Sequence, residues 1–169
     1  MKKDSKKKAV KKVAKKAVKK VAKKNPNSKP KKANMSKQQL ELQSASDSIH
    51  VVEKLIDTIC SNYKVNEDHY GNILVAVTEA VNNAIYHGNK SNPTKKIYVT
   101  FSSSPKAISF TVRDQGEGFD YKHLPDPTDP VNLEKPNGRG VFLMQHLADD
   151  VKFSEKGRCV SLSFAIVAN

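Results

Sequence analysis

The sequence predicts an α+β fold, a two-layer α/β sandwich in which helices cover one face of a mostly antiparallel sheet. Helical and strand patterns do not alternate along the chain, which disfavours βαβ units and a parallel sheet. Two early segments carry apolar residues at helical spacing. Later segments alternate apolar and polar residues and stand in pairs separated by short turns, a pattern typical of β-hairpins.

The fold is expected to begin with a short strand and a helix. Residues 38–44 alternate Leu with polar neighbours, which predicts the strand. Ser46 or Asp47 is expected to cap a helix running to about residue 62, because either side chain can accept from a free backbone N–H. The apolar stripe of this helix consists of Ile49, Val52, Leu55, Ile56 and Ile59.

A second helix is expected from Asn66 to about His87. Asn66 is a favoured N-cap residue, and Glu67 and Asp68 follow it in the first turn, where the helix dipole favours negative charge. Gly88 is expected to supply the C-terminal stop. The apolar face consists of Ile73, Val77, Ala80, Val81, Ala84 and Ile85.

Two hairpins are expected in the second half of the chain. Residues 97–102 and 107–113 form the first, and residues 150–167 form the second with its turn at Lys156 and Gly157. Between them, residues 117–137 are polar and contain four prolines. Loops of that length are usually lids, binding loops or disordered segments. A glycine turn then opens a third helix.

Charge divides the chain into an expected disordered tail, residues 1–37, and a folded domain, residues 38–169. The tail holds 17 Lys against Asp4 alone, a net charge of +16, whereas the domain holds 13 basic and 16 acidic residues, a net charge of −3. Such a tail can bind nucleic-acid phosphates without reading sequence. A solubilising extension and contact with an anionic membrane surface are the alternatives, although the tail has no Trp, Phe or Leu to anchor it.

The cysteines and the hydropathy favour a cytoplasmic protein. Cys60 and Cys159 are far apart and have no metal-ligand spacing, so buried, reduced thiols are expected. No apolar stretch approaches the roughly 18–20 residues that a membrane span requires. The charged N-terminus lacks the apolar region of a secretory signal.

Three polar residues are expected on one face of the second helix. Glu79, Asn83 and His87 are spaced four apart, so they lie one above another on successive turns. A polar row beside an apolar face is typical of a helix that lines a cleft, although a solvated helix margin has the same pattern. Asn82 lies off this row and has no assigned role.

Two glycine-containing segments follow this helix in the sequence. Asp114 stands at the end of an expected strand, before Gly116 and Gly118, where glycines allow close approach of the backbone. The segment Gly138-Arg139-Gly140 opens a helix whose free backbone N–H groups can face phosphate oxygens. Each pattern is common alone, but together with the polar row, in this order, they are specific.

These motifs resemble those of one superfamily. The run E-x-x-x-N-x-x-x-H-G at residues 79–88 resembles the N box of GHKL ATPases and kinases, and D-x-G-x-G at 114–118 and G-x-G at 138–140 resemble its two glycine boxes. The Glu-first N box and the compact domain resemble the anti-sigma-factor serine/threonine kinases of that superfamily, whose ATPase domain is of the histidine-kinase type. The resemblance spans about residues 38–167 and implies the Bergerat ATP-binding fold.

The resemblance implies a role for each motif residue. Glu79 would be the general base that takes the proton from the attacking hydroxyl. Asn83 would bind Mg²⁺ through its side-chain oxygen. Asp114 would accept a hydrogen bond from the adenine amino group. The other residues expected to contact ATP are His87, Gly116, Gly118, Gly138, Gly140 and the cation Arg139.

The implied function is an ATP- and Mg²⁺-dependent protein serine/threonine kinase that acts as an anti-sigma factor. It would phosphorylate an anti-sigma-factor antagonist and, alternatively, hold a sigma factor; a homodimer is expected by resemblance only. The alternative is a non-catalytic ATP-binding module that switches partner affinity, tethered to nucleic acid by residues 1–37. An antagonist that binds but never becomes phosphorylated would favour that alternative.

Overall fold

The structure is a computed structural model of the chain. It describes residues 37–124, 127, 129 and 138–166. Apart from Lys37, the expected tail at residues 1–37 lies outside the described residues, and so does much of the expected loop at residues 117–137. Lys37 is the first residue of the first strand, where it pairs with Ser102.

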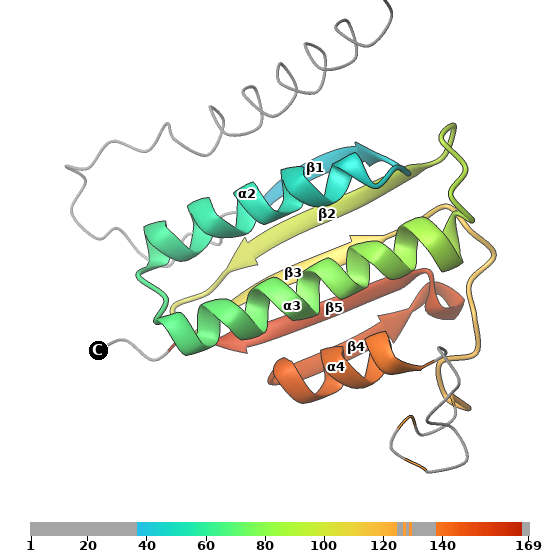
Figure 1. Ribbon diagram of the computed structural model, residues 1–169. Helices are drawn as coiled ribbons and strands as arrows, with labels where there is room; N and C mark the ends of the chain where they lie inside the picture. Colours follow the sequence, from blue (N-terminus) through green and yellow to red (C-terminus); the bar gives the residue numbers. More distant parts are fainter. Residues whose placement is uncertain (1–36, 125–126, 128, 130–137, 167–169) are drawn as a thin grey trace, which may run out of the picture.

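The described residues form a five-stranded sheet in the order β1-β2-β3-β5-β4, and every neighbouring pair is antiparallel. Figure 1 shows the helices over one face of this sheet, so the expected two-layer α+β sandwich is confirmed. Both expected hairpins are present. The strands are β1 (Lys37–Gln43), β2 (Lys96–Ser103), β3 (Ala107–Arg113), β4 (Asp150–Ser154) and β5 (Cys159–Ala165).

The first helix, α2 (Asp47–Tyr63), lies where the sequence predicts it, but its start differs from the prediction. Ser46 occupies the N-cap position with helical backbone angles and makes no side-chain cap bond. The Ser48 hydroxyl instead donates to the carbonyl oxygen of Gln43 at 2.7 Å. The tight connection from β1 places Ser46 in the helical region, whereas a capping side chain requires an extended backbone.

The second helix, α3 (Glu67–Asn83), begins as predicted and ends differently. The side chain of Asn66 accepts from the backbone N–H of His69 at 2.8 Å, which confirms the N-cap. After Asn83 the helix widens into a π turn, η1 (Ala84–Gly88), closed by the Asn89 N–H on the carbonyl of Ala84 at 2.8 Å. Single π turns inside helices are often found at functional sites.

Gly88 does not stop the helix by adopting a left-handed conformation, as the sequence suggested. The residues with positive φ are Lys90 and Ser91, at 53° each. Gly88 is required for another reason: a Cβ there would lie 2.5 Å from Cγ of Asp114. The helical turns do end at Gly88, close to the predicted end at about His87, but the predicted reason was wrong, because the constraint on this glycine comes from Asp114, which directly follows β3.

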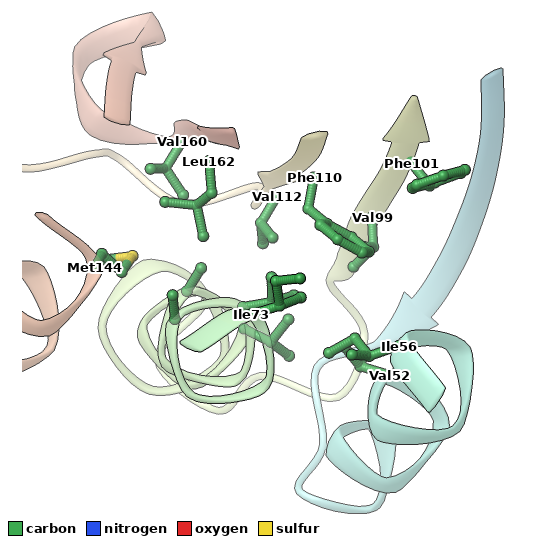
Figure 2. Close-up of a cluster of buried hydrophobic side chains, with 14 of the residues drawn as sticks. Val52, Ile56, Ile73, Val99, Phe101, Phe110, Val112, Met144, Val160 and Leu162 are labelled. Carbon is green, nitrogen blue, oxygen red and sulfur yellow. The ribbon is translucent and has the colours of Figure 1, made fainter. Parts of the chain in front are cut away.

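The core lies between the helices and the sheet (Figure 2). Alternate residues of β2 point to the helices, so Val99 and Phe101 are buried. Phe110 is fully buried between Phe101 and Phe164, with ring centroids 5.5 and 6.4 Å away. Helices α2, α3 and α4 (Arg139–Leu147) cover this layer with Ile56, Ile73 and Met144 among others, and the shared core fixes α3 against the sheet.

Both cysteines are buried and free, as expected. Burial, assisted by the nearby charge of Asp57, raises the pKa of the Cys60 thiol to about 11, so this thiol stays protonated near neutral pH. Of the helices that the structure describes, none is both long enough and apolar enough to cross a membrane.

Candidate nucleotide-binding site

A cleft of about 290 Å³ opens between α3, α4 and the loop that follows β3. Its floor is apolar, with Val112, Met144 and Val160 among the lining side chains. Six of the residues that the sequence proposes for ATP binding line it: Asn83, His87, Asp114, Gly118, Gly138 and Gly140. An apolar cleft with a few convergent polar groups is the usual form of a small-molecule site.

Glu79 and Asn83 converge on the start of α4. A Cβ at Gly140 would lie 2.8 Å from Oε2 of Glu79 and 3.0 Å from Nδ2 of Asn83. The helical phase that the sequence predicted therefore holds, and glycine lets α4 approach both side chains directly. Figure 1 shows α3 and α4 side by side.

The N-terminus of α4 adds positive character to the same place. Gly138 is the N-cap residue, with φ of 91° that favours glycine, and its carbonyl accepts from the N–H of Phe142 at 2.9 Å. The N–H groups of the first helical turn have no acceptor within their own helix. Together with the helix dipole they form a site for anionic oxygens beside Asn83.

The loop from Asp114 to Phe119 is held tightly on the side of α3. A Cβ at Gly116 would lie 2.0 Å from the carbonyl oxygen of Gly88, so any side chain there would push the two segments apart. The side-chain oxygen of Asn89 accepts from the backbone N–H of Gln115 at 2.9 Å. Gly116 is not among the residues that line the cleft. It lets the loop approach Gly88 closely on the side away from the cleft.

The turn between β4 and β5 holds the other side of this loop. The N–H of Asp114 donates to the carbonyl of Arg158 at 3.0 Å, and the N–H of Phe119 donates to that of Lys156 at 2.9 Å. Gly118 has φ of 85°, and a Cβ there would lie 2.1 Å from the Lys156 oxygen. Glu155 and Lys156 also have positive φ, of 52° and 58°. Non-glycine residues in this region are uncommon and cluster at functional sites.

Asp114 is a buried carboxylate, with 9% of its surface exposed. Burial raises its pKa above the ordinary value. The backbone N–H of Gly116, which donates to Oδ1 at 2.6 Å, and the charges of Arg158 and Lys95 oppose this rise. The bond to Gly116 engages Oδ1, so the carboxylate keeps a second oxygen with which to accept from a ligand.

Asp114→Asn is expected to stabilise the fold near neutral pH. The pKa of Asp114 is higher in the folded state than in the unfolded state. The contribution of this side chain to stability is therefore complete at pH values below its pKa in the unfolded state, and it is lost as pH rises through its pKa in the folded state. Asn avoids this loss and keeps an oxygen for the Gly116 N–H. Denaturant unfolding of both proteins at about pH 3.5 and pH 7 measures the effect. If Asp114→Asn changes the free energy of unfolding equally at both pH values, the prediction is contradicted.

The same substitution is expected to weaken ATP binding. If the amide oxygen stays on the Gly116 N–H, the amide NH₂ of Asn would face the adenine amino group that the resemblance assigns to Asp114, and two donors would then oppose each other. Isothermal titration calorimetry with ATP measures the loss. Asp120→Asn is the matched control, because Asp120 is exposed and bonds to His123 and Lys122 outside the cleft.

Several residues of the site carried no clear signal in the sequence. Arg158 and Phe153 line the cleft from the last hairpin, and Asn89 is buried at 0% exposure behind it. Their roles depend on contacts between distant segments, and no local pattern indicates them. Arg139, proposed from the sequence as a phosphate-facing cation, is exposed and is not among the residues that line the cleft.

The donor set fits a hard divalent cation held mainly by a ligand. Among the described residues there is no cluster of three or more His, Cys, Asp or Glu that could bind a metal by itself. Asn83 and Glu79 instead present oxygen atoms at the start of α4. Mg²⁺ commonly takes one or two protein oxygens, several waters and substrate phosphates, so this set suits it.

Comparison with known families agrees with this geometry. The family model of the histidine kinase-like ATPase domain matches residues 42–164, which is most of the chain. The chain belongs to the histidine kinase-like ATPase family. Its matched range runs from β1 to β5 and includes α3, the loop after β3 and the start of α4. The match therefore supports ATP use by this domain, in keeping with the predicted resemblance, and the cleft lies between elements of the matched range.

Three relatives of this ATPase domain have named functions. The chain is 28% identical over 132 residues to the serine-protein kinase RsbW of Staphylococcus epidermidis, covering 73% of this chain and 83% of the relative. It is 25% identical over 124 residues to RsbW of Oceanobacillus iheyensis, covering 70% and 78%. It is 26% identical over 135 residues to the anti-sigma F factor of Bacillus subtilis, covering 76% and 91%.

Proposed function

We propose that this ATPase domain is a Mg²⁺-dependent protein serine/threonine kinase that acts as an anti-sigma factor. It phosphorylates an anti-sigma-factor antagonist and, in the alternative complex, sequesters a sigma factor in the cytoplasm. The observation that carries the proposal is the convergence of Glu79 and Asn83 on Gly140 at the N-terminus of α4. Relatives named serine-protein kinase and anti-sigma F factor support it. The active protein is proposed to be a homodimer, which sedimentation velocity would measure.

The proposed mechanism assigns one task to each group. Asp114 accepts from the adenine amino group, and Gly118 allows the backbone to approach the base. The N–H groups after Gly138 bind the phosphates, and Asn83 offers its oxygen to the metal. Bound Mg²⁺ would neutralise the phosphate oxygens.

Glu79 is assigned the proton transfer. It accepts the proton of the substrate serine hydroxyl as that oxygen bonds to the γ-phosphorus. The bond to the β-phosphate oxygen breaks, and ADP leaves. Glu79 lies beside Asn83 at the start of α4, so a hydroxyl placed next to the metal site would be within its reach. His87, which lines the same cleft, is proposed as a further nucleotide contact.

The proposal is tested with partners recovered from the native cell. The purified protein is used as bait, and each bound partner is incubated with γ-labelled ATP and Mg²⁺. Label on a serine of one partner, together with capture of a sigma factor, is the expected result. A partner that binds in an ATP-dependent way and never acquires label would support the non-catalytic binding module and overturn the kinase proposal.

A second proposed activity, non-specific binding to nucleic acid, concerns residues 1–37 and is favoured by their net charge of +16. Because it would act by releasing counterions, its affinity for duplex DNA should fall by about 10³-fold or more between roughly 50 and 200 mM salt. Deleting residues 1–36 keeps β1 intact and leaves a chain with a net charge near −2. Fluorescence anisotropy with both proteins measures the difference. Equal affinity of the truncated protein would contradict the assignment.

A further inference from the structure

Asn89 is a buried polar residue to which the proposed mechanism assigns no task. Its side chain is 0% exposed and lies directly after the π turn. The amide NH₂ donates to the carbonyl oxygen of Lys96 at 3.0 Å, and the amide oxygen accepts from the N–H of Gln115 at 2.9 Å. A buried polar side chain with both ends paired makes a specific connection, because losing it leaves two backbone groups unsatisfied.

The connection joins three segments that meet at Asp114. Asn89 directly follows the π turn η1, Lys96 begins β2, and Gln115 follows Asp114. Gln115 returns a bond to the same strand, since its side-chain oxygen accepts from the N–H of Lys96 at 2.7 Å. The result is a closed set of hydrogen bonds, which we name the Asn89 clamp: the side chain of Asn89, both backbone groups of Lys96, and the side chain and N–H of Gln115.

The clamp acts on the position of one carboxylate. Asn89 holds the residue directly after Asp114, while its neighbour Gly88 contacts the Asp114 carboxyl group closely enough that a Cβ would lie 2.5 Å from Cγ. Gly116, on the other side, is in contact with the Gly88 oxygen and donates to Asp114 Oδ1 at 2.6 Å. Movement of residues 88–89 would therefore move Asp114.

We propose that Asn89 is a positioning residue that determines selectivity for the adenine base. Its clamp holds the Asp114 carboxylate within hydrogen-bonding distance of the place that the 6-amino group of adenine takes in the proposed complex. The inference rests on the proposed role of Asp114 and goes beyond it. A base contact depends on the position of the carboxylate to within a fraction of an ångström. A residue of purely structural importance would change stability without changing the preference between two bases.

The test compares two nucleotides that differ only at the 6-amino group, ATP and purine riboside triphosphate. Calorimetry gives the ratio of their dissociation constants for the full chain and for Asn89→Ala. In the wild type, ATP should bind about tenfold or more tightly than the analogue, as expected for a hydrogen bond to a charged group. Asn89→Ala should bring the ratio close to that of Asp114→Ala. In the Asp114→Ala background, Asn89→Ala should change the ratio no further.

Asn92→Ala is the matched control, because Asn92 lies in the same loop and its side-chain oxygen accepts from the N–H and the hydroxyl of Thr94, outside the clamp. It should leave the ratio unchanged. If Asn89→Ala does not fold, Gln115→Ala replaces it, since Gln115 is exposed and its side chain supplies one bond of the clamp. A smaller loss of selectivity, about threefold, is then expected from this single bond.

The outcomes separate this inference from the proposed function. A wild type that binds both nucleotides equally would show that Asp114 does not contact the amino group. The proposed role of Asp114 and the positioning role of Asn89 would then both fail. A wild type that discriminates, with Asn89→Ala or its replacement discriminating equally well, would overturn the role of Asn89 alone. Neither measurement requires phosphate transfer, so a failure of the kinase proposal would appear separately.

Discussion

Glu79→Gln should lower the rate of phosphate transfer by about 10²- to 10⁴-fold, the range that a positioned general base contributes. Gln has the shape of Glu and can keep its place beside Gly140, but it has no basic oxygen to take the proton of the substrate hydroxyl. ATP affinity should change little, because Asn83, Asp114 and the N-terminus of α4 remain. Single-turnover transfer of label and calorimetry with ATP give the two quantities.

Glu67→Gln is the matched control for this substitution. Glu67 lies on the same helix in its first turn, three turns from Glu79, and is exposed. Its change removes the same charge from the protein but leaves the cleft untouched, so transfer should continue at the wild-type rate. If Glu79→Gln and Glu67→Gln transfer phosphate equally well, Glu79 is not the base. A variant that loses ATP binding together with transfer would instead assign Glu79 to the nucleotide or metal site.

Gly116→Ala should weaken ATP binding by about 10- to 100-fold. This range corresponds to the roughly 1–3 kcal/mol of folding free energy that overpacking commonly costs, here expressed as displacement of the loop that holds Asp114. The added methyl group would lie 2.0 Å from the carbonyl oxygen of Gly88 and 2.8 Å from Oδ1 of Asp114. Both neighbours are held in place, Gly88 by the π turn and Asp114 by its bond to the Gly116 N–H. The loop must therefore move away from α3, and the Asp114 carboxylate moves with it.

Gly71→Ala is the control for the glycine substitution. Gly71 lies within α3, and a Cβ there would meet nothing within 4 Å. Replacing a helical glycine by alanine at such a place should stabilise the protein by about 0.5–1 kcal/mol and leave ATP binding unchanged. Calorimetry and thermal unfolding of both variants measure the contrast. Equal ATP affinity of Gly116→Ala and the wild type would show that this close approach is not needed.

The parts of the fold that the sequence predicted are those that local rules govern. Asn66 caps α3 because its side chain reaches a backbone N–H three residues away, and the apolar stripe of α2 follows from helical spacing. The phase of Glu79 and Asn83 is local in the same sense, since regular helix continues to Asn83. Beyond that residue, the π turn altered both the helix end and the role expected of Gly88.

Other expectations failed or were never formed because distant residues decide them. Ser46 does not cap α2, because the connection from β1 holds it in the helical region. Asn89 looks like an ordinary polar residue after a helix, and only the fold brings it to Gln115, 26 residues further along the chain. The carbonyl oxygens of Arg158 and Lys156, in the last hairpin, accept hydrogen bonds from the loop that follows β3. No sequence motif indicated these contacts.

By itself, the sequence determined the α+β class, most of the element bounds and the motif residues of the cleft, because spacing along a helix or strand sets which side chains share a face. The tertiary structure alone decided how Asp114 is held. That geometry depends on glycines in contact across separate segments and on hydrogen bonds from Asn89 and Arg158, all of which form only when the helices pack on the sheet.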